Sequence, residues 1–323
     1  MTTFFDQRHG RRRTLGLLWA TAIVGSLPQT AAAQNQRLLR IGFQKYGTLT
    51  LLKVRGTLER RLALLGITVS WSEFPAGPVL LEALNVGSID YGTVGEAPPI
   101  FAQAAGADLL YVGNEPASPK SEAIVVQRDS RIRSVADLKG RKVVLNKGSN
   151  VHYLLVRALE HAGLAYTDVQ TVFLAPADAR AAFERGSVDA WVIWDPFLAA
   201  AEKQLGARVV VDGSGLVSNH QFFLAARSYA AKNPDVLQLI LEELAKVDQW
   251  AQQNPQQVAA ALAVQTGLDA SVLELAVRRF TYGVQAVSPA VITEQQRIAD
   301  SFAALKLIPK PIDVRTALPV QKS

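Results

Sequence analysis

The stretch GSIDYGTVGEAP, residues 87–98, has a counterpart in GSVDAWVIWDP, residues 186–196. The two GSxD turns are 99 residues apart, and the acidic residues near the ends of both stretches share that offset. Further out, Gly47-Thr48 matches Gly148-Ser149 at an offset of 101. Each pair occupies the same place in a strand–loop–helix unit. Three matched pairs in one order predict two related halves, and therefore a bilobed molecule with a cleft between its lobes.

Short apolar strands alternate with helical periodicity over the first two thirds of the chain. Residues 39–43 and 68–74 are expected to be strands, for example, and residues 49–65 and 79–86 helices. This alternation predicts an α/β fold with mainly parallel sheets. After about Ala226 only helical patterns remain, at residues 234–253, 255–266, 270–280 and 293–305. A helical tail without strands of its own is expected to pack on the α/β part.

The first 33 residues have the layout of a secretory signal peptide. A basic start with Arg11, Arg12 and Arg13 precedes an apolar run at 15–27, and Ala31-Ala32-Ala33 offers a cleavage site. We therefore expect export to the periplasm with cleavage near Ala33. An uncleaved membrane anchor is the alternative, and the paired arginines also permit the twin-arginine export route.

Charge and composition exclude several classes of function. The net charge of +6 falls to +3 once residues 1–33 are removed, too little and too dispersed for a nucleic-acid partner. The chain has no cysteine, which excludes disulfides and thiolate metal sites. It also lacks an HExxH motif, a phosphate-binding P-loop and a GxSxG elbow. No metal and no cofactor is expected.

Four segments are placed where a ligand is expected in an open α/β sheet, beyond the carboxyl ends of strands. They are residues 44–48, 95–97, 148–151 and 194–195. Each follows a strand and opens a helix, so each is expected to present free backbone N–H groups and the positive end of a helix dipole. Converging amides of this kind suit an oxyanion such as a sulfonate, sulfate or phosphate, without a fixed Lys or Arg.

Individual side chains near these segments leave alternatives open. Trp194 is either a flat wall for an organic ligand or a core residue at a strand end. Glu96 either caps a helix or faces the cleft, and Asp195 is expected to be a cap. Ser149 and His152, three residues apart, are the pair that a hydrolytic enzyme on this frame would use.

Several segments in combination resemble the periplasmic aliphatic-sulfonate-binding protein of the sulfonate ABC transporter, within the taurine, nitrate and sulfonate solute-binding family. They are LRIGFQKYGTLTLLK (39–53), FPAGP (74–78), GSIDYG (87–92), VADLKG (135–140) and WVIWDPF (191–197). The resemblance implies a type 2 periplasmic-binding-protein fold with two α/β lobes joined by two hinge strands near 122–127 and 221–226. Lobe one would comprise residues 38–121 plus 226–318, with the helical tail packed on it, and lobe two residues 122–225.

The resemblance also implies a function and a set of ligand-contacting residues. The protein would be a monomeric, non-catalytic solute-binding component that closes around an organic sulfonate and delivers it to an ABC permease and its ATPase. The hydroxyls of Thr48 or Ser149 would meet the sulfonate head. Taurine, nitrate and a thiamine precursor remain alternative ligands. The implied ligand-binding residues are Gln44, Gly47, Thr48, Gly95, Glu96, Ala97, Ser149, Asn150, Val151, Trp194 and Asp195.

Overall fold

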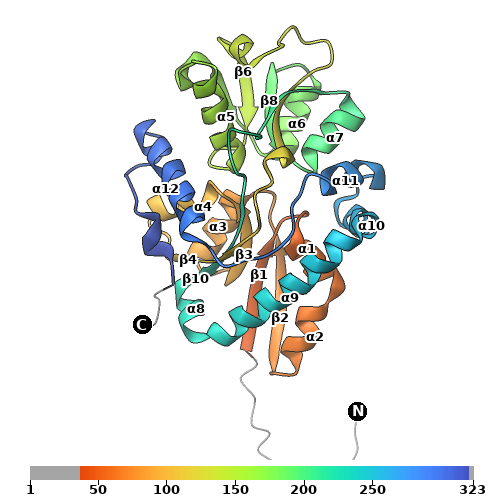
Figure 1. The fold of residues 1–323 in the computed structure, drawn as a ribbon, viewed down its shortest axis with the longest axis vertical. Coiled ribbons are helices and arrows are strands. Elements are labelled where there is room, and N and C mark those ends of the chain that lie inside the picture. Colours follow the sequence, from red (N-terminus) through yellow and green to blue (C-terminus); the bar gives the residue numbers. More distant parts are fainter. Residues whose placement is uncertain (1–36, 320–323) are drawn as a thin grey trace, which may run out of the picture. The chain divides into compact units, whose positions relative to one another are not determined.

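The computed structural model describes residues 37–319, which fold around two five-stranded sheets (Figure 1). The expected signal peptide lies outside these residues. No helix between residues 37 and 319 is long and apolar enough to cross a membrane. The first half contains β1 (Arg37–Phe43), α1 (Thr48–Arg55), α2 (Thr57–Ala63), β2 (Ile67–Glu73), α3 (Gly77–Asn85), β3 (Tyr91–Gly95), α4 (Pro98–Ala104) and β4 (Leu109–Asn114).

The second half repeats this order of elements. It contains β5 (Glu122–Val126), β6 (Lys142–Leu145), α5 (Asn150–His161), β7 (Gln170–Phe173), α6 (Pro176–Glu184), β8 (Ala190–Trp194), α7 (Phe197–Leu205), β9 (Arg208–Asp212) and β10 (Gln221–Ala226). Central strands such as β3 and β5 are buried along their whole length, as expected for a sheet covered by helices on both faces.

The two sheets have the same topology, with one strand exchanged between them. Their strand orders are β2-β1-β3-β10-β4 and β7-β6-β8-β5-β9. Strand β5 pairs antiparallel with β8 and β9, and β10 pairs antiparallel with β3 and β4. The predicted α/β fold of two lobes is confirmed. Residues 221–225, however, were expected in the second lobe and lie in the first sheet, because β10 fills the gap between β3 and β4.

The repeated GSxD turns perform the same structural task in both halves. The amide of Asp90 donates to the carbonyl of Arg40 at 2.8 Å, and the Asp90 carboxylate accepts from the Arg40 amide at 2.9 Å. Asp189 makes the same two bonds with Lys142, at 2.9 and 2.8 Å. Asp90 also binds the Arg40 guanidinium at 2.6 and 3.0 Å. The repeat read from the sequence therefore reflects a repeated anchor for the strand that leads to the site.

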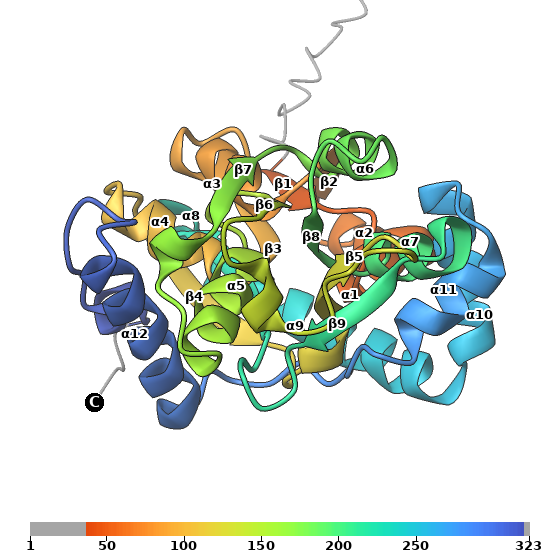
Figure 2. The same cartoon turned by 90° about the horizontal axis from the view of Figure 1, so that it is seen from above.

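The chain ends in helices that contact both lobes (Figures 1 and 2). These are α8 (Arg227–Lys232), α9 (Pro234–Gln253), α10 (Pro255–Thr266), α11 (Ala270–Val277) and α12 (Pro289–Ala304). Helix α9 packs on α1 and α2, α10 on α1, and α12 on α4, all in the first lobe. Helix α11 packs on α7 of the second lobe. The tail was expected on lobe one, where α9, α10 and α12 pack, and α11 packs on lobe two in addition.

Removing the charge of each repeated aspartate tests the anchor. We expect Asp90→Asn to lower the free energy of unfolding by about 2 kcal/mol and Asp189→Asn by less than about 1 kcal/mol, because only Asp90 also binds a guanidinium. Urea unfolding followed by tryptophan fluorescence measures both values. Equal losses, or a larger loss at Asp189, would contradict this assignment.

Candidate ligand-binding site

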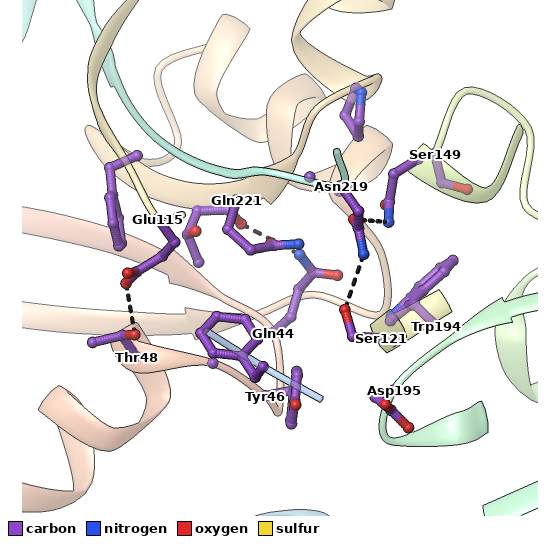
Figure 3. Close-up of a pocket in the computed structure, with 18 residues that line it drawn as sticks. Gln44, Tyr46, Thr48, Glu115, Ser121, Ser149, Trp194, Asp195, Asn219 and Gln221 are labelled. Atoms are coloured by element: carbon purple, nitrogen blue, oxygen red, sulfur yellow. Dashed lines mark hydrogen bonds between the residues drawn. The ribbon is translucent and has the colours of Figure 1, made fainter. Parts of the chain in front are cut away.

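A cavity of about 50 Å³ lies between the two lobes and receives residues from both (Figure 3). The side chains of Gln44, Ser121, Asn219 and Gln221 surround its centre, with Trp194 and Asp195 on the side of the second lobe. The predicted residues that line it are Gln44, Gly47, Thr48, Gly95, Ser149, Asn150, Trp194 and Asp195. The lining residues that sequence reasoning missed are Tyr46, Gly77, Thr93, Pro98, Glu115, Ser121, Asn219, Gln221, Phe223 and Phe280.

Two of the four predicted helix starts line the cavity and have no side-chain cap. Helix α1 follows Gly47, whose φ of 90° needs glycine, and α5 follows Ser149. Neither helix has a side-chain cap or an acidic residue in its first turn. The first amides of a helix have no acceptor within it, so these two starts need partners from outside. They come from different lobes, and their dipoles therefore act on one cavity from two sides.

The other two helix starts differ from the prediction. Helix α4 begins with Pro98 and Pro99, which carry no N–H group and so remove two donors. Helix α7 is capped by the protein itself, because Asp195 Oδ1 accepts from the Ala199 amide at 3.0 Å. The expectation that Asp195 is a cap agrees with this bond. A start that was missed, that of α3, brings Gly77 of the FPAGP segment to the cavity.

The hydroxyls of Thr48 and Ser149 are engaged within the protein and do not serve as free donors. Thr48 Oγ1 lies 2.7 Å from Glu115 Oε1 and 2.8 Å from Asp248 Oδ1. Ser149 Oγ donates to the carbonyl of Asn146 at 2.7 Å. The expectation that these hydroxyls meet the ligand is therefore not what the structure shows. They fix the loops at the two helix starts.

Glu115 and Asp248 form a buried acidic pair behind α1. Burial and the neighbouring Asp248 carboxylate raise the pKa of Glu115 well above its usual value, and burial raises the pKa of Asp248 to about 6. Glu115 also accepts from the Gly283 amide, and Asp248 from the Val284 amide, both at 2.8 Å. Burial beside Asp248 therefore disfavours the charged form of Glu115 at the wall of the cavity.

Asn219 joins the two segments that cross between the lobes. It lies in the segment between β9 and β10 with a φ of 51°, a left-handed conformation that asparagine tolerates. Its Nδ2 donates to the Ser118 carbonyl at 3.0 Å and to Ser121 Oγ at 2.9 Å, both in the other crossing segment. Its Oδ1 accepts from Asn150 Nδ2 at 2.8 Å, at the start of α5. One side chain thus ties the hinge to the cavity.

Gly95 is needed for the lobes to meet. A Cβ on Gly95 would lie 2.5 Å from Asn150 Oδ1, so the first lobe has room for the start of α5 only because residue 95 has no side chain. Asn150 is held there by Glu122, whose Oε2 accepts from its Nδ2 at 2.6 Å.

Three predicted residues lie outside the cavity lining. Ala97 and Val151 are fully buried in the core. Glu96 turns toward the hinge, where Oε2 accepts from the His220 amide at 3.1 Å and Oε1 is buried without a partner. Burial raises the pKa of Glu96 to about 8. Glu96 therefore acts on the crossing segment between β9 and β10, and neither of its two earlier interpretations describes this.

The Ser149–His152 pair does not have the geometry of a nucleophile and base. His152 Nδ1 accepts from the Gly148 amide at 3.2 Å, and Nε2 lies 2.7 Å from the Tyr166 hydroxyl. Burial lowers the pKa of His152 to about 4. With both ring nitrogens and the serine proton engaged elsewhere, His152 has a structural role in α5.

Charge around the cavity is balanced without a basic side chain in its lining. None of the lining residues is Lys or Arg, and Glu115 and Asp195 are its acidic members. Burial raises the pKa of Asp195 to about 7, against the opposing effect of Arg279, whose Nη1 lies 3.5 Å from Oδ1. The raised pKa of Glu115 and the pairing of Asp195 with Arg279 reduce negative charge at the wall, where amide dipoles favour a single negative charge.

Aromatic residues from both lobes also line the cavity. Trp194, Tyr46 and Phe280 all line it, and the last two meet edge to face at 5.6 Å between centroids. Rings next to amide donors suit a ligand with an anionic head and an apolar tail.

Two α/β lobes, two crossing segments and a polar cavity between them define a solute-binding protein of the type 2 periplasmic-binding fold. The chain belongs to the NMT1-like family, whose family model matches residues 32–265. A relative in Escherichia coli (strain K12), named for the binding of aliphatic sulfonates, is 47% identical over 306 residues, 94% of this chain and 95% of its own.

Two solved structures are similar over nearly the whole described chain. The alkanesulfonate-binding protein SsuA from Xanthomonas axonopodis pv. citri, bound to MOPS, gives a TM-score of 0.83 at 44% identity and covers 87% of this chain and 98% of that one. The periplasmic aliphatic sulphonate binding protein SsuA from Escherichia coli gives 0.80 at 48%, with 89% and 94% covered.

The buried Glu96 carboxyl predicts a pH-dependent stability. Its raised pKa means that the folded state binds a proton that the unfolded state releases. The resulting stabilisation is complete below about pH 4.5 and is lost as pH rises to about 8. Glu96→Gln is therefore expected to flatten the fall of unfolding free energy between pH 5 and 8, by up to about 1.4 kcal/mol per pH unit.

Urea unfolding at several pH values measures this slope, and Glu82→Gln, at an exposed position of α3, is the control. Parallel curves for Glu96→Gln and the parent chain would contradict the assignment.

Proposed function

We propose that this chain is the solute-binding component of an ABC importer and that it captures aliphatic sulfonates in the cavity between its lobes. The observation that carries the proposal is a cavity lined by uncapped helix starts from both lobes and by no Lys or Arg. Two relatives that are 44% and 48% identical are sulfonate-binding proteins by name, which supports the same ligand class.

The charge balance favours a monoanion over sulfate. Helix amides and side-chain amides such as those of Gln44 and Gln221 satisfy one delocalised negative charge well. A second negative charge on the ligand would be repelled by Asp195, and the lining contains no Lys or Arg to balance it. Sulfonates keep a single charge and add an organic tail, and that tail can lie against Trp194, Tyr46 and Phe280.

The hydrogen-bond donors that we propose for the ligand differ from those expected from the sequence. The head would be held by the amides at the starts of α1 and α5 and by the side chains of Gln44 and Gln221. The hydroxyls of Thr48 and Ser149 position those loops. The MOPS that is bound to the Xanthomonas relative is a propanesulfonate with a bulky ring, consistent with a tail that is read loosely.

The remaining steps follow from this role. The protein would be exported through residues 1–33, act as a monomer in the periplasm, and deliver its ligand in the closed form to a membrane permease and its ATPase. It would carry out no chemistry on the ligand. This agrees with the separate engagement of Ser149 and His152.

Calorimetric titration tests the ligand class. The purified chain is expected to bind ethanesulfonate, butanesulfonate and MOPS, and to bind sulfate and nitrate at least about 10-fold more weakly, because neither inorganic ion buries an apolar tail. A preference for sulfate or nitrate would remove the sulfonate assignment. A strong preference for taurine over ethanesulfonate would narrow the protein to an aminosulfonate carrier.

Replacing Trp194 tests whether its ring contacts the apolar tail of the ligand. We expect Trp194→Ala to reduce the affinity gain from methanesulfonate to butanesulfonate, while the affinity for methanesulfonate changes little. The expected loss for the longer ligand is about 10-fold, the value of burying about two methylene groups. Trp250→Ala, on α9 outside the lining, is the matched control. An equal loss for both ligands would place Trp194 at the head instead.

A further inference from the structure

Helix α11 brings the tail of the chain onto the second lobe. It follows α10, which packs on α1 of the first lobe, and it packs itself on α7 of the second (Figures 1 and 2). The contact is made by the small or branched side chains of Ala199, Ala200, Val272 and Ala276, each at most 2% exposed. This apolar contact is small, so it adds little to the free energy that holds the lobes together. The polar contacts beside it are therefore important for that free energy.

Arg279, two residues beyond α11, places a guanidinium against two acids of the second lobe. Its Nη2 lies 2.6 Å from Glu202 Oε2 on α7, and its Nη1 lies 3.5 Å from Asp195 Oδ1. The side chains of Arg279 and Glu202 are only 17% and 23% exposed, and that of Asp195 is fully buried. Charges this far removed from water interact more strongly than an ordinary surface pair.

The same cluster touches the ligand cavity. Asp195 lines the cavity, and its Oδ2 is buried without a hydrogen-bond partner. Phe280, the residue after Arg279, lines the cavity as well. On the other side, Tyr46 lies in the first-lobe loop of the cavity and donates its hydroxyl to the carbonyl of Ala276 at 3.0 Å. The C-terminal end of α11 is thus bound to site residues of both lobes, Tyr46 in the first and Asp195 in the second.

We propose that Arg279 is an interlobe latch: it holds the lobes closed through Glu202 and positions Asp195 at the cavity, and thereby sets the rate at which ligand leaves. The part of this inference that concerns ligand release rests on the proposed function. Arg279 touches neither cavity nor ligand, so it is a positioning residue.

The latch follows from the geometry of closure. Helix α11 packs on α7 but is also tied to the first lobe through α10 and Tyr46, so, with α11 moving with the first lobe, lobes that separate break the contacts of Arg279 with Glu202 and Asp195. A contact present only in the closed form shifts the equilibrium toward that form, and the apparent affinity rises with the closed fraction. Loss of the latch therefore speeds dissociation, while encounter with the open form is unchanged.

Stopped-flow kinetics with ethanesulfonate, followed by tryptophan fluorescence, test the proposal. Arg279→Ala is expected to raise the dissociation rate constant about 10-fold and to change the association rate constant by less than about 2-fold. Glu202→Gln is expected to have a smaller effect. Arg279→Lys is expected to recover part of the loss, because an ammonium reaches one carboxylate but cannot span two. Arg180→Ala breaks an exposed pair with Glu184 within α6 and is the control.

Two results would overturn the latch. One is a dissociation rate constant for Arg279→Ala equal to that of the parent chain. The other is a faster rate that Arg279→Lys does not reduce and that accompanies an equal loss of melting temperature, since this would indicate general destabilisation.

Small-angle scattering without ligand separates the latch from the proposed function. The radius of gyration of Arg279→Ala is expected to exceed that of the parent chain, and added salt is expected to expand the parent but not the variant. Identical radii would overturn the latch. Failure of the parent chain to bind any sulfonate would instead overturn the proposed function, and the scattering result would still stand.

Discussion

Strand β10 hydrogen-bonds to β3 and β4 in the first sheet although it follows β9 of the second, and β5 hydrogen-bonds to β8 and β9 in the second sheet although it follows β4 of the first. The chain must therefore cross between the lobes twice, beside the carboxyl ends of the parallel strands. Ser121 and Asn219 lie in these crossings and line the cavity. The topology thus places the hinge next to the ligand, and any movement of the lobes changes the site.

The neutrality of the cavity wall is a second constraint, and it determines which acids the site can tolerate. A carboxylate beside an anion site would repel the ligand unless it is protonated or paired. Burial beside Asp248 raises the pKa of Glu115 and disfavours its charged form, and Asp195 is paired with Arg279. Both acids serve the scaffold through bonds to Thr48 and Ala199. Their structural work is compatible with anion binding only because their charges are suppressed.

Much of the fold followed from local patterns, whereas the donors of the site did not. The repeated GSxD turns predicted two halves because Asp90 and Asp189 anchor equivalent strands. Strand ends predicted Gln44, Gly47 and Asn150. The prolines at 98 and 99 were visible in the sequence and should have removed α4 from the list of donors. Glu115, directly after a strand, could have been found by the same rule.

Other features depend on tertiary contacts that no local pattern records. The bond from Asp195 to the Ala199 amide, and the bonds of Thr48 and Ser149 to groups within the fold, exist only after the loops close on themselves. Nothing near Phe280 or Arg279 in the sequence indicates a cavity or an interlobe contact, because both reach the site through the packing of α11 on α7. The insertion of β10 into the first sheet likewise depends on the space between β3 and β4, which lie far from β10 in the sequence.

Release matters as much as capture for a carrier, and the structure divides the work of closure accordingly. Helix and amide dipoles in the cavity favour the binding of an anion, but they hold it less strongly than a buried Lys or Arg would. Under the proposed latch, contacts at α11 would stabilise the closed form whichever tail the ligand carries. A ligand can shift the lobes only by the difference in its affinity for the two forms. Because part of the closing free energy comes from the protein itself, short and long sulfonates can both produce the same closed shape for a single membrane partner.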